Sequence, residues 1–437
     1  MASPPPPPPL ALAGTAARLK AWRSGEPLGW LGGNQVHLLR GGDTLFPAMI
    51  EAIAQARDSV WLATYIFHDD PQAQQLAEAL AAAARRGVAV KVVVDGFGTN
   101  RTLDQVQAWL LEAGVALTVF RPLTRWWNWL QPGQLRRLHQ KLCVVDDALG
   151  FVGGINVIGD RLDMNHGPTE EPRLDFAVAV RGPLVADISQ ATRSVWTRAA
   201  MGQQWRQEVQ AVWRGAEPLK AARELWREWR RSSRQRTAGQ AAEAQQPMRA
   251  ALVVRDNLRQ RRSIERAYIE AIQSARTRVD LVTPYFYPGQ NFRRALIAAA
   301  RRGAQVRLIL QGKVDYRIAG LAARVLYNEL LAEGVEIYEY MPAFLHAKVA
   351  VVDEAWATVG SSNIDPLSLL LNLEANVVVQ DAEFAREVAA ELAQARAASQ
   401  QVLPGSYAPG PAAVLGRALV AWVAHWYLRM AGLSGRY

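Results

Sequence analysis

Two stretches of the 437-residue sequence share one pattern: His139-Gln-Lys141-Leu-Cys-Val-Val-Asp146 and His346-Ala-Lys348-Val-Ala-Val-Val-Asp353. Each reads H-x-K-x4-D, and each is followed by a small-residue turn and an asparagine, Asn156 in one case and Asn363 in the other. The apolar, β-branched run after each lysine predicts a buried strand. Since histidine and lysine stand two residues apart, their side chains point the same way on such a strand.

The repetition extends beyond the two motifs. Ala82–Gly87 (AAARRG) recurs as Ala298–Gly303, and Val90–Gly96 (VKVVVDG) recurs as Val306–Gly312 (VRLILQG), at a nearly constant offset. Helical and apolar-strand patterns alternate in both copies, which predicts an α/β fold with a parallel or mixed sheet and helices on both faces. The sequence is therefore interpreted as an internal duplication.

Composition restricts the class of protein. Half of the residues are hydrophobic, as in a globular protein, and the formal net charge is +10. This charge favours an anionic partner: nucleic acid, an anionic lipid surface or a phosphorylated substrate. Cys143 is the single cysteine, so no disulfide can form within the chain. We find no signal-peptide pattern, and no uninterrupted apolar run of the roughly 20 residues that a spanning helix needs.

The duplication also predicts the division into domains. The expected segments are a tail at 1–34, a first domain at 35–200, a basic helical or flexible linker at 201–247, a second domain at 248–400 and a C-terminal amphipathic membrane-interface helix at 401–437.

Two segments suggest contact with a membrane. Within 413–431, basic residues line one side of a predicted helix and aromatic and aliphatic residues the other, which is typical of a helix at a membrane interface. The alternative is a helix packed on its own domain.

Segment 121–137 crowds Trp126, Trp127 and Trp129 among arginines, a pattern that suits lipid headgroups. It could equally form a lid over the site, and both roles could hold.

The paired motifs contain what cleavage of a phosphodiester requires. One imidazole can attack phosphorus while the other protonates the leaving oxygen and later deprotonates an incoming alcohol. Lys141 and Lys348 would hold the phosphoryl oxygens, with hydrogen bonds from Asn156, Asn363 and a hydroxyl of Ser361 or Ser362. No metal and no cofactor is expected, since no cluster of Cys, His and carboxylates resembles a metal site.

Four acidic residues complete the candidate site. A nucleophilic histidine needs an acidic partner to fix its tautomer, and Asp175 and Glu374 occupy equivalent positions in the two copies. Asp146 and Asp353 belong to the catalytic motif. Because they stand at strand ends next to turns, we expect them to fix those turns rather than to transfer protons.

At these residues the chain resembles the phospholipase D superfamily. Residues 346–377 (HAKVAVVDEAWATVGSSNIDPLSLLLNLEANV) and 139–157 (HQKLCVVDDALGFVGGINV) are similar to bacterial cardiolipin synthases. The B type is favoured because two N-terminal spanning helices are absent and because IFHDD (66–70) and an LLYNxL-like segment (325–330) are present. The first motif has Gly154 where the second has Ser361, and so one hydroxyl fewer.

The resemblance has implications for fold and activity. It implies two phospholipase-D-like α/β/α sandwich domains that share one active site at their interface. It also implies metal-independent transfer of a phosphatidyl group between two phosphatidylglycerol molecules, which releases glycerol. His139 would be the nucleophile and His346 the acid and base. Such an enzyme would bind peripherally to a membrane, at the cytoplasmic side of a bacterial inner membrane, and we expect no nucleic-acid partner.

Three alternatives remain open from the sequence. A phospholipase D or another phosphatidyltransferase would use the same phosphohistidine, and water or a different alcohol would accept the group. A nuclease would also suit the basic charge, although the tryptophans and the C-terminal segment argue against it. A non-catalytic lipid- or nucleic-acid-binding module would retain the motifs only as remnants, which two intact copies make improbable.

Overall fold

The computed structural model describes residues 28–406 apart from 123–135, 165, 213–247, 256–261, 314–323, 325 and 366–371, and side chains at 203–212 are left out as well. The tryptophan-rich part of segment 121–137 and the whole of 413–431 therefore lie outside the described residues, as does most of the expected linker. The division into domains stays a prediction. Strand β1 (Leu31–Arg40) begins slightly before the expected first domain, and helix α5 (Val185–Val212) runs into the expected linker.

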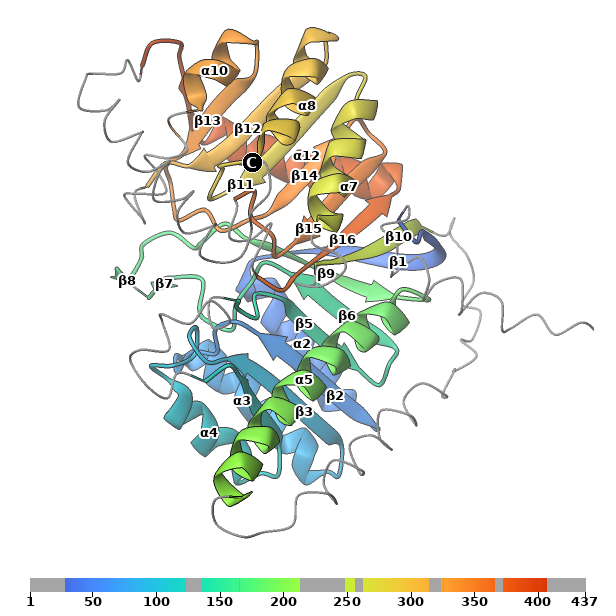
Figure 1. Cartoon of the computed structure of the whole chain (residues 1–437), viewed down its shortest axis with the longest axis vertical. Coiled ribbons are helices and arrows are strands. Elements are labelled where there is room, and N and C mark those ends of the chain that lie inside the picture. Colours follow the sequence, from blue (N-terminus) through green and yellow to red (C-terminus); the bar gives the residue numbers. More distant parts are fainter. Residues whose placement is uncertain are drawn as a thin grey trace, which may run out of the picture.

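The first half of the chain alternates strands and helices, continues with antiparallel strands and ends in a long helix (Figure 1). After β1 follow α2 (Gly42–Gln55), β2 (Ser59–Thr64), α3 (Pro71–Arg85), β3 (Ala89–Asp95), α4 (Leu103–Leu111), β4 (Ala116–Phe120), β5 (Lys141–Val145), β6 (Leu149–Gly153), the small hairpin β7 (Leu162–Asp163) and β8 (Gly167–Pro168), β9 (Phe176–Arg181) and α5.

The second half repeats this sequence of elements. They are β10 (Met248–Arg255), α7 (Ser263–Ser274), β11 (Arg278–Thr283), α8 (Gln290–Arg301), β12 (Gln305–Gln311), α10 (Tyr327–Ala332), β13 (Glu336–Tyr340), β14 (Val349–Val352), β15 (Trp356–Gly360), β16 (Glu374–Gln380), α12 (Ala382–Ala397) and β17 (Ser399–Val402).

The strands of both halves join in one sheet within the described part of the chain. Its order is β17-β13-β12-β11-β14-β15-β16-β10-β1-β9-β6-β5-β2-β3-β4. Outward from the β1–β10 contact, the order β1-β9-β6-β5-β2-β3-β4 recurs as β10-β16-β15-β14-β11-β12-β13. Neighbours among β2, β3 and β4 are parallel, as are those among β11, β12 and β13, while the other pairs are antiparallel. The predicted duplication and mixed sheet are thus both present.

Helices cover both faces of each half. The helices α2, α3 and α4 pack on one face of the first half, and α7, α8 and α10 pack on one face of the second. The opposite faces contribute to a shared central core, together with α5 and α12. Figure 1 shows α5 crossing the strands of the first half. Each half therefore has the α/β/α layering that the resemblance implied.

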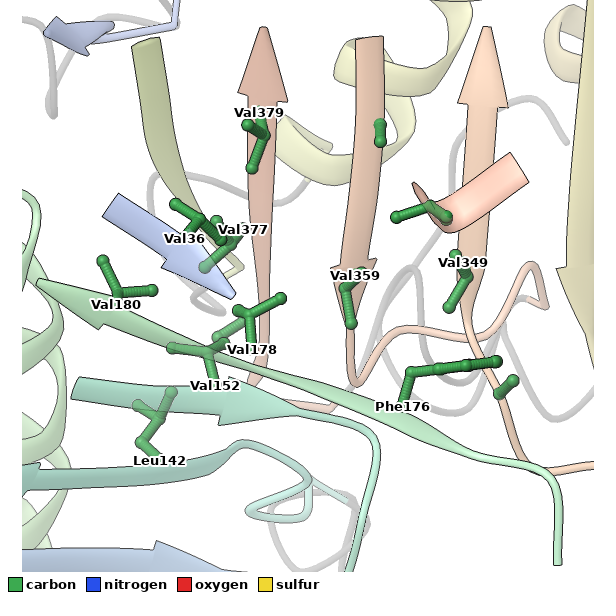
Figure 2. Packing of buried hydrophobic residues seen from close by; sticks show 14 of the residues in the cluster. Val36, Leu142, Val152, Phe176, Val178, Val180, Val349, Val359, Val377 and Val379 are labelled. Carbon is green, nitrogen blue, oxygen red and sulfur yellow. The ribbon is translucent and has the colours of Figure 1, made fainter. Parts of the chain in front are cut away.

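Many side chains of the central core are valines, and they come from both halves. Figure 2 shows Val36, Val178 and Val377, from β1, β9 and β16, gathered where the two parts of the sheet meet, and all three are buried. Complete burial of a valine stabilises a fold by about 1.5–3 kcal/mol. The contact between the halves is therefore a true hydrophobic core, and it fixes how the two motifs face each other.

Candidate active site

The motif strands β5 and β14 are buried along their whole lengths. Backbone hydrogen bonds connect the entry of each strand to the opposite half. The N–H of His139 donates to the carbonyl of Leu373 at 3.0 Å, and the N–H of His346 donates to that of Leu174 at 2.9 Å. Each leucine immediately precedes an acidic residue, so the backbone alone places each histidine beside the carboxylate of the other half.

The side chains follow this crossed arrangement. Nδ1 of His139 lies 3.0 Å from Oε2 of Glu374, and Nδ1 of His346 lies 2.6 Å from Oδ2 of Asp175. The structure thus brings together both histidines and the two acidic residues expected to orient them. It adds that each carboxylate serves the histidine of the opposite half.

Both imidazoles are neutral near pH 7. Burial lowers the pKa of His139, and although Glu374 opposes this shift, the net direction is downward. Burial also holds the pKa of His346 well below its ordinary value, and Lys348 and Lys141 lower it further. A neutral imidazole that donates its Nδ1–H to a carboxylate presents a lone pair at Nε2. Each ring is therefore prepared to act as a nucleophile or a base.

The carboxylates are ionised at the same pH. Burial raises the pKa of Asp175 to about 6, against the effect of Lys348. Burial also acts to raise the pKa of Glu374, but His139 and Lys141 outweigh it and the net shift is downward. Because water is largely excluded here, these charges interact more strongly than they would at the surface.

Lys141 and Lys348 lie close to the backbone of their own motif histidines. The Nζ of Lys141 donates to the carbonyl of His139 at 2.7 Å, and the Nζ of Lys348 donates to that of His346. Burial lowers the pKa of Lys141 to about 7 and that of Lys348 to about 8, although Glu374 and Asp175 oppose the shift. When both lysines are protonated, their charges balance those of the two carboxylates, and the six side chains carry no net charge; as pH rises through about 7, Lys141 begins to lose its proton.

The predicted polar groups differ in their surroundings. Ser361 is fully buried, and its hydroxyl donates to Oε2 of Glu374 at 2.6 Å while it accepts from the N–H of Ala375 at 3.0 Å. This contact suits orientation of the carboxylate. Oδ1 of Asn156 accepts a long bond, 3.4 Å, from the N–H of Ile66. Oδ1 of Asn363 is buried and has no hydrogen-bond partner within the described part of the chain.

Asp146 and Asp353 stand at the far ends of the motif strands. From Lys141 to Asp146 the strand extends over about 17 Å. Asp146 accepts backbone hydrogen bonds at 2.8 Å from Arg57, Asp58 and Ser59, where β2 begins. Asp353 accepts equivalent bonds from Arg276, Thr277 and Arg278, where β11 begins. Both residues adopt positive φ, 50° and 54°. This is the turn-fixing geometry expected from the sequence.

Some residues at the site were not predicted from the sequence. The ring centroid of Tyr65 lies 5.1 Å from that of His139, and Nζ of Lys141 lies 5.6 Å from the tyrosine ring. The side chain of Gln140 is buried and donates to the carbonyl of Glu374 at 3.0 Å. The repeated pattern WLATYIF (61–67) and DLVTPYF (280–286) places Tyr65 where the second copy has Pro284. This difference between the copies is the signal in the sequence that could have identified Tyr65.

The described residues form neither a metal-binding cluster nor a membrane-spanning helix. No group of three or more His, Cys, Asp or Glu side chains there is arranged to hold a metal ion. None of the helices in the described ranges has the length and apolar character needed to cross a bilayer.

Comparison with known proteins shows the family. The family model described as cardiolipin synthase, PLD-like domain, matches residues 49–167 and 268–396, one segment in each half. Cardiolipin synthase B of Salmonella typhi is 40% identical over 356 residues, which are 82% of this chain and 79% of that protein. Cardiolipin synthase B of Escherichia coli K12 is 39% identical over 355 residues, 81% of this chain and 78% of that protein.

A solved structure has the same fold. The crystal structure of phosphatidylserine synthase from Haemophilus influenzae Rd KW20 superposes with a TM-score of 0.64, at 14% identity, over 95% of this chain and 99% of that one. The predicted fold class is therefore confirmed, and so is the predicted resemblance. The chain belongs to the cardiolipin synthase family of phospholipase-D-like proteins.

Proposed function

We propose that this site transfers a phosphatidyl group from one phosphatidylglycerol to a hydroxyl of another, with His139 as the nucleophile. Membership of the family and 40% identity to a cardiolipin synthase B confirm the predicted class of enzyme, a phosphatidyltransferase that forms cardiolipin. The roles of individual residues, the donor lipid and the position at a membrane are the finer parts of the proposal.

The first step forms a phosphohistidine. Nε2 of His139 attacks phosphorus, the N–P bond forms, and the bond from phosphorus to the departing glycerol oxygen breaks. His139 is suited to this role because it is neutral and Glu374 holds its Nδ1–H, so the imidazolium character that develops during attack is stabilised. His346 donates the proton that the departing glycerol takes up.

His346 must therefore be protonated when the lipid is bound. In the free site its pKa is held well below the ordinary value. A phosphodiester brings one negative charge into a buried cluster of side chains that is otherwise balanced, and that charge favours protonation of the nearest base. In the second step the neutral His346 takes a proton from the hydroxyl of the second phosphatidylglycerol, which attacks phosphorus and releases His139.

The lysines and asparagines hold the phosphoryl oxygens in this proposal. Lys141 and Lys348 supply two buried cations, and the transition state concentrates negative charge on oxygens between them. The amide of Asn363 has an unsatisfied buried oxygen, and rotation of the amide would present its N–H groups to a phosphoryl oxygen.

One observation carries the proposal: two histidines, each paired with a carboxylate of the opposite half, share a site with two buried lysines. The test is purified protein with phosphatidylglycerol vesicles. Cardiolipin and glycerol are expected in equal amounts. If phosphatidic acid forms without cardiolipin, the enzyme is a hydrolase. His139→Ala should be inactive, whereas the surface variant His37→Ala should keep full activity, and an active His139→Ala protein would exclude the mechanism.

We also propose that the enzyme works at the surface of a membrane, at the cytoplasmic side of a bacterial inner membrane. Both the donor and the acceptor lipid reside in a bilayer, and the formal net charge of +10 attracts anionic headgroups. Partition onto anionic liposomes should exceed retention by DNA at matched salt. Equal retention by DNA would favour the nuclease alternative.

A further inference from the structure

Each half fixes the residue before its motif histidine with a side chain from the end of its third strand. Oδ2 of Asp95, the last residue of β3, accepts from the N–H of Leu138 at 2.8 Å. Oε1 of Gln311, the last residue of β12, accepts from the N–H of Leu345 at 2.9 Å. The two contacts are equivalent under the duplication, because VVVDG in the first copy aligns with LILQG in the second.

These anchors act at the crossing between the halves. Leu138 forms an isolated β-bridge with Leu373, and Leu345 forms one with Leu174. The next residue in each case is a motif histidine. An acceptor that fixes Leu138 or Leu345 therefore helps to determine where the adjacent histidine enters the site. This contact links positions 43 residues apart, so Asp95 does more than close its own local turn.

The two anchors differ in charge. Asp95 is fully buried, and its Oδ1 also accepts from the N–H of Phe97 at 2.8 Å. Nη1 of Arg137 lies 3.8 Å from that oxygen and donates to the carbonyl of Arg121 at 3.4 Å. Arg137 thus pairs with the carboxylate of Asp95 and also holds the backbone of Arg121, so that both ends of segment 121–137 are connected at this point.

In the described residues of the second half, the equivalent anchor has no arginine to neutralise. Only four residues separate β13 from Leu345, and the neutral amide of Gln311 accepts the hydrogen bond there. The difference extends to the motif lysines. Burial lowers the pKa of both lysines. Among the carboxylates that oppose this shift, Glu374 and Asp175 act on both lysines, whereas Asp95 acts on Lys141 and Asp365 acts on Lys348.

We propose that Asp95 is a positioning residue that couples Arg137, and through it the backbone of Arg121, to the entry of His139, and that its negative charge acts on Lys141 rather than on Lys348. Gln311 provides the same anchor without the charge. The inference rests on the proposed roles of His139 and Lys141. It means that the two halves differ in the residues that fix the entry to each motif strand, as well as in the motifs themselves.

Two variants separate anchoring from charge. Asp95→Gln copies the anchor of the second half, and Asp95→Asn keeps the size of the side chain, while both remove the charge. Gln311→Glu is the matched control, because it adds charge to the other half. The rate of cardiolipin formation is measured against pH, with thermal unfolding in parallel. Since Asp95 raises the pKa of Lys141, its neutral variants should move the alkaline limb of kcat/KM down by about half a pH unit. Gln311→Glu should not move it down.

A second measurement needs no activity. The NMR titration of the Lys141 side chain, assigned with Lys141→Arg, should shift to lower pH in Asp95→Gln while that of Lys348 stays. If wild-type protein made no cardiolipin, the proposed function would fail and this titration would still decide the role of Asp95. Unchanged lysine titrations and pH profiles, with rate losses that follow thermal stability, would reduce Asp95 to a turn residue and overturn the proposal.

Discussion

Nδ1 of His139 lies 3.0 Å from Oε2 of Glu374, which stands 235 positions later in the chain. The reciprocal pair, His346 with Asp175, spans 171 positions. Because the carboxylate that fixes each imidazole belongs to the opposite half, neither half contains a complete histidine–carboxylate pair. The hydrophobic core between the halves therefore also brings the two pairs together.

Removal of the charge at Glu374 should impair the first step. Glu374→Gln keeps the size of the side chain but no longer stabilises an imidazolium at His139 and can favour the wrong tautomer. We expect kcat to fall by about 10²- to 10⁴-fold, the range typical of such groups. Rapid-quench measurement of the first glycerol released should show the loss in formation of the phosphohistidine.

The reciprocal variant Asp175→Asn should slow both steps, because the proposed mechanism uses His346 in each of them. Glu391→Gln is a suitable control, since that side chain forms an ion pair with a half-exposed Arg40 at the surface. A Glu374→Gln enzyme that released its first glycerol at the wild-type rate would show that the carboxylate has no part in the attack.

The sequence predicted the elements of this site better than their connections. Periodicity and duplication were sufficient to predict the buried motif strands, the mixed sheet and the pairing of Asp175 with Glu374 as equivalents. They could not decide which carboxylate serves which histidine, because a contact within one half satisfies the pattern equally well. The hydrogen bonds that determine the pairing, such as that from the N–H of His139 to the carbonyl of Leu373, join backbone atoms. They therefore cannot be predicted from patterns of side chains.

The buried lysines should impose an alkaline limit on activity. Burial lowers the pKa of Lys141 to about 7 and that of Lys348 to about 8, so both lose their protons as pH rises through this range. Since the proposal requires the cations, kcat/KM should fall between about pH 7 and pH 8. A bound phosphodiester favours the protonated lysines, so the limb of kcat should lie at higher pH.

Rates measured from about pH 5 to pH 9 test this prediction. Lys141→Arg gives an informative comparison, because guanidinium keeps its charge throughout. Its alkaline limb should then reflect Lys348 alone and lie higher, although its rate is lower. A wild-type kcat/KM that stays level up to about pH 9 would contradict the assignment of the lysines as essential cations.

The motif aspartates should matter for stability rather than chemistry. Asp353→Ala removes a carboxylate that fixes three backbone N–H groups and leaves alanine at a φ of 54°, so we expect a loss of about 2–4 kcal/mol in the free energy of unfolding. Asp146→Ala should behave similarly. At low temperature, the folded fraction of each variant should keep kcat/KM within a few-fold of the wild-type value. Denaturant unfolding measures the loss of stability, and activity assays on the same samples measure kcat/KM.

The effect at Asp353 should also depend on pH. Burial acts to raise its pKa, but the hydrogen bonds from Thr277 and Arg278 outweigh it, and the pKa in the folded protein lies below its ordinary value. A lowered pKa contributes stability above the pKa of the unfolded state and loses it as pH falls through the folded value. The difference in stability between wild type and Asp353→Asn should therefore shrink below about pH 4. A constant difference down to about pH 3 would contradict this account.

Gly154 and Asp175 form a matched pair, as do their equivalents Ser361 and Glu374. A Cβ at position 154 would overlap with Oδ1 of Asp175, whereas the longer Glu374 leaves room for Ser361 and accepts its hydroxyl at 2.6 Å. Gly154→Ser should therefore displace Asp175 from His346 and lower kcat by more than about tenfold. Gly154→Ser with Asp175→Glu recreates the pair of the second half and should recover part of the loss. The cycle of single and double variants measures this coupling. If the effects of Gly154→Ser and Asp175→Glu were independent, the size of the acidic residue would not explain why the first half has glycine where the second has Ser361.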